Sequence, residues 1–119
     1  MMNSMVLISG LFFSSCYYDI DEELYPLGGI CDTTAVSFAM DVLPIIQTHC
    51  TNCHSGGSPS GSISLSTHSD IEQQALSGLL LCTMSHADGC SAMPQNAGKL
   101  PDCNISKIQK WIENGALNN

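Results

Sequence analysis

The residues with the clearest chemical potential are two cysteines and a histidine near the middle of the chain. Cys50, Cys53 and His54 form the pattern Cys-x-x-Cys-His, which is the attachment pattern of a c-type haem. The spacing suits this cofactor because two thiols can add to the two vinyl groups along one side of the porphyrin, while the adjacent histidine lies under the iron. The segment therefore predicts one covalently bound haem c, with His54 as an axial ligand.

Two other uses of the same side chains remain open. Cys50 and Cys53 could form a redox-active dithiol, although no βαβ pattern surrounds them. Together with His54 and a further cysteine, they could instead bind zinc. Adjacent cysteine and histidine side chains seldom both reach one tetrahedral metal, so the pattern favours haem.

A second axial ligand is expected from a methionine in the C-terminal half. Met93 directly precedes Pro94, and the proline restricts Met93 to an extended backbone that can aim its side chain inward. Met84 lies in an apolar run and is expected in the core. Met40 stands just before the first expected helix and is expected to pack there. The sequence therefore favours Met93.

The histidines offer one rival to this methionine. His86 could ligate the iron instead and would give a haem of lower potential. His68 is expected to be solvated, and His49 is expected to point away from the iron. A histidine and methionine pair closes both axial positions and raises the potential, which favours electron transfer over peroxidase or oxygenase chemistry. We therefore expect no enzymatic activity, no catalytic residues and no small-molecule substrate.

The N-terminal segment indicates export. Residues 5–13 form a mostly apolar run that is too short to span a bilayer and is typical of the core of a secretory signal. Ser14, Ser15 and Cys16 follow, and they resemble the lipobox of bacterial lipoproteins, in which the cysteine is lipidated. We expect a signal peptide over residues 1–15 and a lipid anchor at Cys16, in the outer membrane on its periplasmic or cell-surface face. A plain signal peptide and an N-terminal strand remain the alternatives.

The next segment predicts a tether, followed by one small domain. Residues 16–30 contain an acidic run and then proline and glycine, a composition that suits a solvated linker. Residues 31–119 would form the domain, which is small enough to need a cofactor or disulfides for stability.

Composition excludes several classes of protein. The 119 residues include three lysines and arginines against eleven acids, for a formal net charge of −8. A nucleic-acid binder or a basic membrane-surface helix needs a basic face that this chain lacks. Hydrophobic residues make up 44% of the chain, which is too apolar for a disordered protein. Seven cysteines indicate an oxidising compartment, a metal or a haem.

Four helices are expected, and no strand pattern competes with them. The first is capped by Asp41 and ends at about His49. The second begins at a capping box made by Ser69 and Glu72 and ends at about residue 77. The third covers residues 79–84. The last buries one face, carried by Ile105, Ile108, Trp111 and Ile112, and ends near Gly115. Trp111 is expected in the core or near the haem edge.

These features together resemble a monohaem class I c-type cytochrome. The resemblance rests on Cys-x-x-Cys-His at the end of a helix, a glycine-rich loop, the Met93-Pro94 pair and a last helix that carries Trp111. More closely, residues 31–119 resemble the small planctomycete-type bacterial cytochrome c domains. The resemblance implies an all-α cytochrome c fold, with three to five helices around one haem and Met93 as the sixth ligand.

The resemblance also implies a disulfide framework. Members of that family often have a cysteine before the first helix and another at the start of the last helix, at positions that match Cys31 and Cys103. Cys82 and Cys90 would then close a short loop ahead of Met93. Pairing of Cys90 with Cys103 remains an alternative, as do buried free thiols.

The expected function is therefore that of a membrane-tethered single-electron carrier. Its partners would be redox proteins that donate and accept electrons. An accessory subunit of a larger respiratory or surface assembly remains open. A haem-based sensor or peroxidase also remains open, if the sixth position is free.

Overall fold

The computed structural model describes residues 30–119, and every regular element in this range is a helix. The elements are η1 (Phe38–Val42), α2 (Leu43–His49), η2 (Ser60–Ser62), α3 (His68–Leu76), α4 (Leu79–Met84) and α5 (Asp102–Glu113). The expected all-α class is confirmed for these residues. No helix of this range is long and apolar enough to cross a bilayer. The expected signal peptide, the Cys16 anchor and almost all of the tether lie outside the described residues.

The first helix begins earlier than the sequence indicated. Ser37 is its N-cap rather than Asp41, and the Ser37 hydroxyl accepts a hydrogen bond from the Met40 N–H at 3.1 Å. The Asp41 carboxylate in turn accepts from the Ser37 N–H at 3.0 Å. These two hydrogen bonds close the π-helical turn η1. η1 continues directly into α2, and α2 ends at His49 as expected. Met40 is 80% exposed on this turn, so the prediction that it packs is wrong.

The capping box of α3 also lies two residues earlier than expected. The Thr67 hydroxyl accepts from the Asp70 N–H at 3.2 Å, and the Asp70 carboxylate accepts from the Thr67 N–H at 3.1 Å. The predicted cap at Ser69 is therefore wrong, although Ser69 and Glu72 have the same spacing. Asp70 is held further by the Ser64 hydroxyl at 3.0 Å, a contact across the loop that no local pattern reveals.

Two other helices were predicted well. α4 has the expected bounds, and the segment that follows it, residues 85–101, contains no regular element. α5 buries Ile108 and Trp111 almost completely. The helix stops just before Gly115, whose φ of +94° suits a residue without a side chain.

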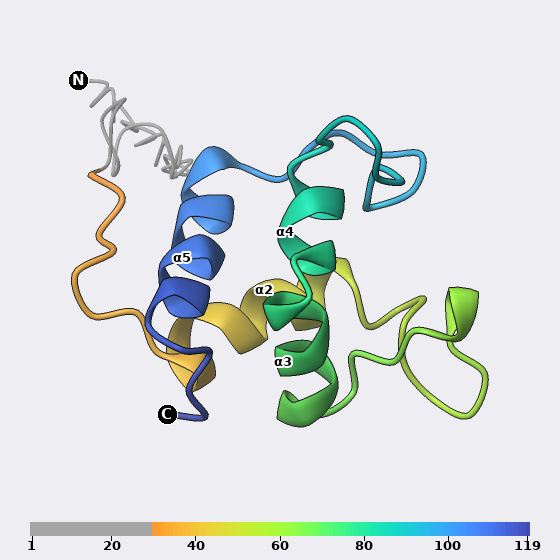
Figure 1. Cartoon of the computed structure of the whole chain (residues 1–119), viewed down its shortest axis with the longest axis horizontal. Helices are drawn as coiled ribbons and strands as arrows, with labels where there is room; N and C mark the ends of the chain where they lie inside the picture. Colours follow the sequence, from red (N-terminus) through yellow and green to blue (C-terminus); the bar gives the residue numbers. More distant parts are fainter. Residues whose placement is uncertain (1–29) are drawn as a thin grey trace, which may run out of the picture.

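The core lies where α5 packs against η1 and α4, while α3 packs against α4 (Figure 1). Phe38, His68 and Trp111 form an aromatic cluster there, with the Phe38 and His68 rings 4.6 Å apart edge to face. The His68 Nε2–H donates to the Ala116 carbonyl at 2.9 Å, so the prediction that His68 is solvated is wrong. The Trp111 indole N–H donates to the Leu117 carbonyl at 2.8 Å.

Residues far apart in the chain complete the start of η1. The Asn119 side-chain oxygen accepts from the Phe38 N–H, and the Asn119 backbone oxygen accepts from the Ala39 N–H, both at 2.9 Å. These bonds satisfy two N–H groups that a helix N-terminus leaves unpaired. The Lys107 ammonium also reaches the Asp41 carboxylate at 2.9 Å, which ties α5 to η1. The C-terminal end accordingly lies beside this turn in Figure 1.

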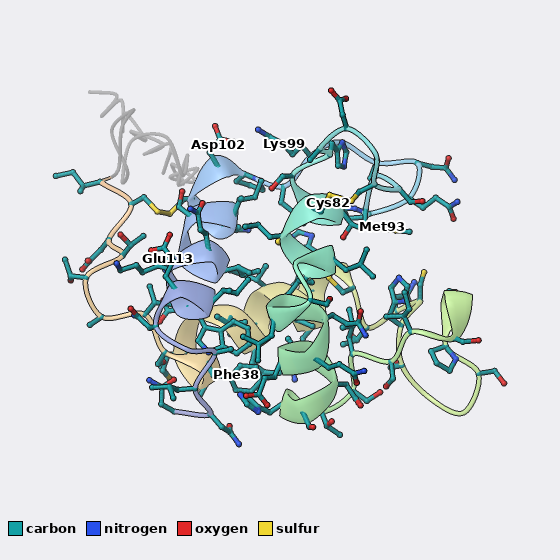
Figure 2. The ribbon with its side chains drawn as sticks, viewed as in Figure 1. Phe38, Cys82, Met93, Lys99, Asp102 and Glu113 are labelled. Carbon is teal, nitrogen blue, oxygen red and sulfur yellow. A yellow bond between two sulfur atoms is a disulfide. The ribbon has the colours of Figure 1, made fainter. Side chains whose placement is uncertain are left out.

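Two disulfides cross-link the described part of the chain. Cys31 and Cys103 are bonded at 2.03 Å, and Cys82 and Cys90 at 1.99 Å, which are the pairs that the resemblance implied. The first links the segment before η1 to the start of α5, where Lys99 and Asp102 form an ion pair at 2.8 Å (Figure 2). With sequence separations of 72 and 8 residues, the chain-entropy relation gives stabilisation of about 4 and about 2 kcal/mol.

The two candidate caps of α3 can be separated by mutation. Thr67→Ala removes the acceptor for the Asp70 N–H and should lower the free energy of unfolding by about 1 kcal/mol. Ser69→Ala is the matched control, because the exposed Ser69 side chain caps nothing, and it should change stability by less than about 0.5 kcal/mol. Urea denaturation followed by circular dichroism measures both. A larger loss from Ser69→Ala would contradict the observed cap.

The Asp41 carboxylate should make stability depend on acid pH. Hydrogen bonds from the Ser37 N–H and from Lys107 hold the pKa of Asp41 below its ordinary value of 3.8. A folded pKa below the unfolded one stabilises the fold fully above about pH 4, and this contribution disappears as the pH falls through the folded pKa. The stability difference between the parent protein and Asp41→Asn should therefore be largest near pH 6 and shrink toward pH 2. Thermal unfolding at a series of pH values tests this, and a constant difference would contradict it.

Candidate functional site

The four residues expected to bind the cofactor line one cavity. Cys50, Cys53, His54 and Met93 all border a space of about 900 Å³ between the segment after α2, the helix α4 and the irregular segment before α5. This volume lies within the range of about 300 to 1,000 Å³ that is typical of small-molecule and cofactor sites. Residues 40 positions apart in the chain are thus brought to a common space.

The end of α2 gives the first three of these residues their arrangement. The Cys50 N–H donates to the Ile46 carbonyl at 2.9 Å and closes the last helical turn. The N–H groups of Cys53 and His54 then donate to the Cys50 carbonyl, at 3.1 and 3.0 Å. These bonds form one tight turn, and both thiols and the imidazole border the cavity from it.

The His54 ring is held in one tautomer. Its Nδ1 lies 3.1 Å from the Ile63 carbonyl oxygen, and because a carbonyl can only accept, Nδ1 must carry the hydrogen. In the neutral ring, Nε2 therefore keeps a free lone pair. Histidines that bind metals usually donate their other ring N–H to a carboxylate or carbonyl in this way. Ile63 was not singled out from the sequence, since no local pattern marks a backbone acceptor.

The two thiols differ in exposure. Cys53 is exposed, whereas Cys50 is half-buried, and neither is in a disulfide. Burial raises the pKa of the Cys50 thiol to about 11. The attacking thiol of a redox-active dithiol depends on a lowered pKa, so this environment makes Cys50 a poor attacking group.

The zinc alternative also finds little support in the described residues. A tetrahedral site would need a further cysteine beside Cys50, Cys53 and His54. The other cysteines of residues 30–119 are all bonded to one another as disulfides. Within this range, no three histidine, cysteine, aspartate or glutamate side chains come together as a metal-binding group.

Met93 borders the cavity from the irregular segment before α5, and Figure 2 shows it close to the end of α4. Its N–H donates to the Thr83 carbonyl at 3.0 Å. Its carbonyl accepts a hydrogen bond from the His86 Nε2 at 3.0 Å. His86 is not among the cavity-lining residues, whereas Thr83 and Met84 are. The structure therefore does not bring the rival ligand His86 to the cavity and places it against the main chain of Met93.

The cavity walls are largely apolar. Buried or nearly buried aliphatic side chains line them: Leu65, Leu80, Met84 and Leu100. The lining set contains no aspartate, glutamate, lysine or arginine. Met84 is buried in the core as expected, with 3% exposed. His49 also borders the cavity, and its orientation away from the iron stays a prediction.

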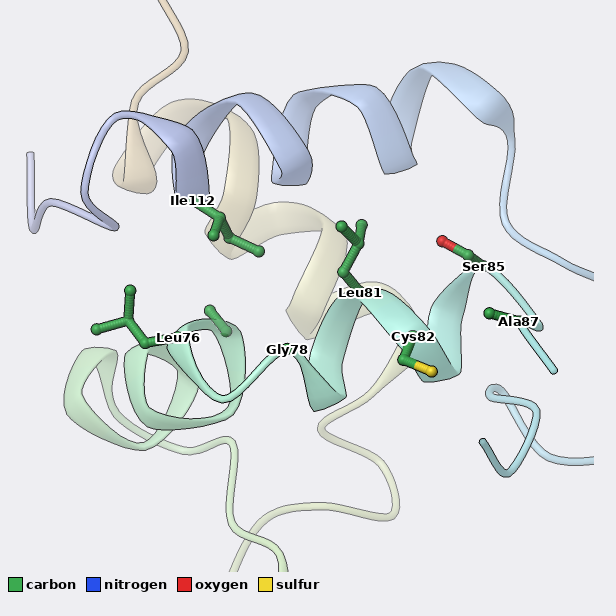
Figure 3. A pocket seen from close by; sticks show the side chains of 8 residues that line it. Leu76, Gly78, Leu81, Cys82, Ser85, Ala87 and Ile112 are labelled. Carbon is green, nitrogen blue, oxygen red and sulfur yellow. The ribbon is translucent and has the colours of Figure 1, made fainter. Parts of the chain in front are cut away.

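A second hollow, of about 510 Å³, lies between the junction of α3 with α4 and the helix α5 (Figure 3). Leu76, Leu81 and Ile112 form its apolar sides. Its only sulfur belongs to Cys82, which is bonded to Cys90. Because no histidine, carboxylate or free thiol lines it, this hollow lacks groups for chemistry, and the larger cavity is the candidate functional site.

Comparison with known proteins adds no assignment. The chain matches no protein-family model, no curated protein and no solved structure. A functional interpretation therefore depends on the residues of the cavity.

The difference between the two thiols predicts their order of alkylation. In the folded protein without a bound cofactor and with its disulfides intact, iodoacetamide at pH 8 should modify Cys53 at least about tenfold faster than Cys50. The reason is that Cys50 is less accessible, and a pKa of about 11 leaves almost none of it as thiolate. Peptide mass spectrometry over time measures both rates. Equal rates would contradict the burial of Cys50, and denaturation in urea should remove the difference.

Proposed function

We propose that residues 31–119 form a small class I-type cytochrome c domain that carries one haem c and transfers single electrons. Cys50 and Cys53 would hold the haem through thioether bonds, and His54 and Met93 would be its axial ligands. The observation that carries this proposal is that these four side chains border the same apolar cavity. The sequence motif alone does not require Met93 to lie there.

The cavity fits a haem in its chemistry as well as in its size. The donor set comprises two unpaired thiols, an imidazole with a free Nε2 and a thioether. Aliphatic walls such as Leu80 and Leu100 suit the apolar faces of a porphyrin. A haem bound at this site would supply an iron that takes up and releases one electron as it passes between the ferric and ferrous states.

The protein residues would set the properties of that iron. The bond from His54 Nδ1–H to the Ile63 carbonyl fixes the ring orientation and the tautomer. The neutral thioether of Met93 favours the ferrous state and so raises the potential. With both axial positions filled by side chains, no site is left for a substrate, and the domain acts as a carrier rather than as an enzyme.

The location and partners follow from the N-terminal segment. Under this proposal, the signal peptide directs export, and a lipid on Cys16 anchors the protein to the outer membrane. Residues 16–30 act as the tether that lets the domain reach its partners. These partners are redox proteins that donate and accept one electron at a time, and neither nucleic acid nor a small-molecule substrate is involved.

An absorption spectrum tests the proposal directly. The protein expressed together with a c-type maturation system should be coloured. The haem should stay with the polypeptide under denaturing conditions, because it is covalently attached. The oxidised protein should show the weak sulfur-to-iron band at the red end of the spectrum. A colourless protein would overturn the proposal, and haem without that band would overturn the role of Met93.

Three methionine variants separate the ligand from its neighbours. Met93→Ala should abolish the sulfur-to-iron band, lower the reduction potential and allow carbon monoxide to bind the reduced protein, because it opens the sixth position. Met84→Leu keeps the volume of the other methionine at the cavity and should keep the band. Met40→Ala changes an exposed side chain and should match the parent protein. Loss of the band in Met84→Leu, with retention in Met93→Ala, would reverse the assignment.

A further inference from the structure

Both main-chain polar groups of Met93 are attached to the end of α4. The Met93 N–H is bonded to the Thr83 carbonyl, and the Met93 carbonyl is bonded to the His86 side chain, each at 3.0 Å. The segment around Met93 has no regular secondary structure, and its neighbours Ser91 and Gln95 are exposed. These two hydrogen bonds are therefore what fixes the main chain from which the Met93 side chain enters the cavity.

The His86 ring acts here as a donor. Since the Met93 carbonyl can only accept, Nε2 of His86 must carry the hydrogen. This nitrogen is thus engaged with the main chain and is not free to bind a metal.

The backbone at His86 is strained and closely confined. His86 has a φ of +53°, a left-handed conformation that side-chain-bearing residues rarely adopt and that costs of order 1 kcal/mol. The N–H of His86 donates to the Thr83 carbonyl at 3.2 Å, and the N–H of Ala87 to the Cys82 carbonyl at 3.1 Å. The disulfide from Cys82 to Cys90 closes the same turn. This conformation turns the imidazole toward Met93, and strain of this kind is concentrated at functional sites.

We propose that His86 is a positioning residue for the ligand Met93. Its Nε2–H holds the Met93 carbonyl, so that the thioether remains directed into the cavity and rebinds quickly whenever it leaves the iron. This inference rests on the proposed function, because it requires Met93 to be the sixth ligand. His86, which the sequence offered as an alternative axial ligand, would instead hold Met93 in position.

A matched pair of variants tests the hydrogen bond. His86→Leu and His86→Gln have side chains of similar size, and both keep a side chain at the positive φ, so their backbone costs are comparable. Only glutamine can donate to the Met93 carbonyl. Each variant is made in the full chain with the haem attached, and carbon monoxide binding to the reduced protein reports how often the thioether is detached.

In His86→Leu, the rate of carbon monoxide binding should rise about fivefold, the change expected for the loss of one neutral hydrogen bond. The sulfur-to-iron band of the oxidised protein should weaken in parallel. In His86→Gln, both properties should return to within about twofold of the parent protein. Equal behaviour of the two variants would overturn the inference, whether both match the parent or both are impaired.

A second readout does not depend on ligand binding at the iron. The ¹⁵N chemical shifts of His86 in the reduced protein with the haem attached should show hydrogen on Nε2 and a lone pair on Nδ1. The opposite tautomer would overturn the inference, since the bond to the Met93 carbonyl could not then form.

Failure of this inference can be distinguished from failure of the proposed function. If the parent protein carries covalent haem and Met93→Ala abolishes the band, but His86→Leu behaves as the parent does, only the positioning role is overturned. If the parent protein carries no haem, both proposals are overturned. Thr67→Ala controls for general destabilisation, because it weakens the cap of α3 and removes no hydrogen bond of Met93 or His86, and it should leave the carbon monoxide rate unchanged.

Discussion

The main constraint on this structure is a cavity of about 900 Å³ that must stay open in a small domain. Among residues 30–119, only fourteen hydrophobic side chains are buried. A small chain would normally use such apolar surface to form a single core. Here Leu65, Leu80, Met84 and Leu100 belong to the core cluster and to the cavity wall at once. The surrounding elements therefore need fixed positions from other sources. Two disulfides and the hydrogen bonds between distant segments supply them.

Three of the four histidines help to fix these elements through one kind of hydrogen bond, from a ring N–H to a backbone carbonyl. His54, His68 and His86 each place one ring nitrogen at 2.9 to 3.1 Å from a backbone carbonyl. What differs is the surroundings of the rest of the ring. In His68 the ring packs against both Phe38 and Trp111 at the margin of the core. In His54 the ring borders the cavity, which leaves its second nitrogen available to a ligand.

The sequence predicted those parts of the fold that depend on local patterns. The helix α4, the buried face of α5 and the stop before Gly115 all follow from apolar spacing and backbone preference within a few residues. The predicted cap positions were wrong because Ser37 and Thr67 compete with nearby residues of equal local merit, and contacts outside the cap favour the observed arrangement. Asp41 is needed to pair with Lys107, 66 positions away, and Asp70 also binds Ser64 across a loop.

The sequence allowed the candidate haem-binding side chains to be selected, but it did not reveal the hydrogen-bond partners that hold them. Cys50, Cys53, His54 and Met93 could be selected because their residue types and spacing carry the chemistry. The acceptor of His54 is a backbone carbonyl at Ile63, and the partner of the Met93 carbonyl is a histidine seven residues earlier. Backbone acceptors have no residue type to reveal them. The position of His68 was mispredicted for the same reason, because its acceptor is the backbone carbonyl of Ala116.

The bonds from Asn119 to the start of η1 have a consequence for the order in which the protein can be completed. The turn η1 that leads into α2 and Cys50 has its first two N–H groups, those of Phe38 and Ala39, bonded to Asn119. Before Asn119 docks on η1, these two N–H groups lack their partners and the start of the helix is less stable. In the finished structure, by contrast, Cys50 is half-buried. Any reaction that needs both thiols freely accessible is therefore favoured before Asn119 docks on η1.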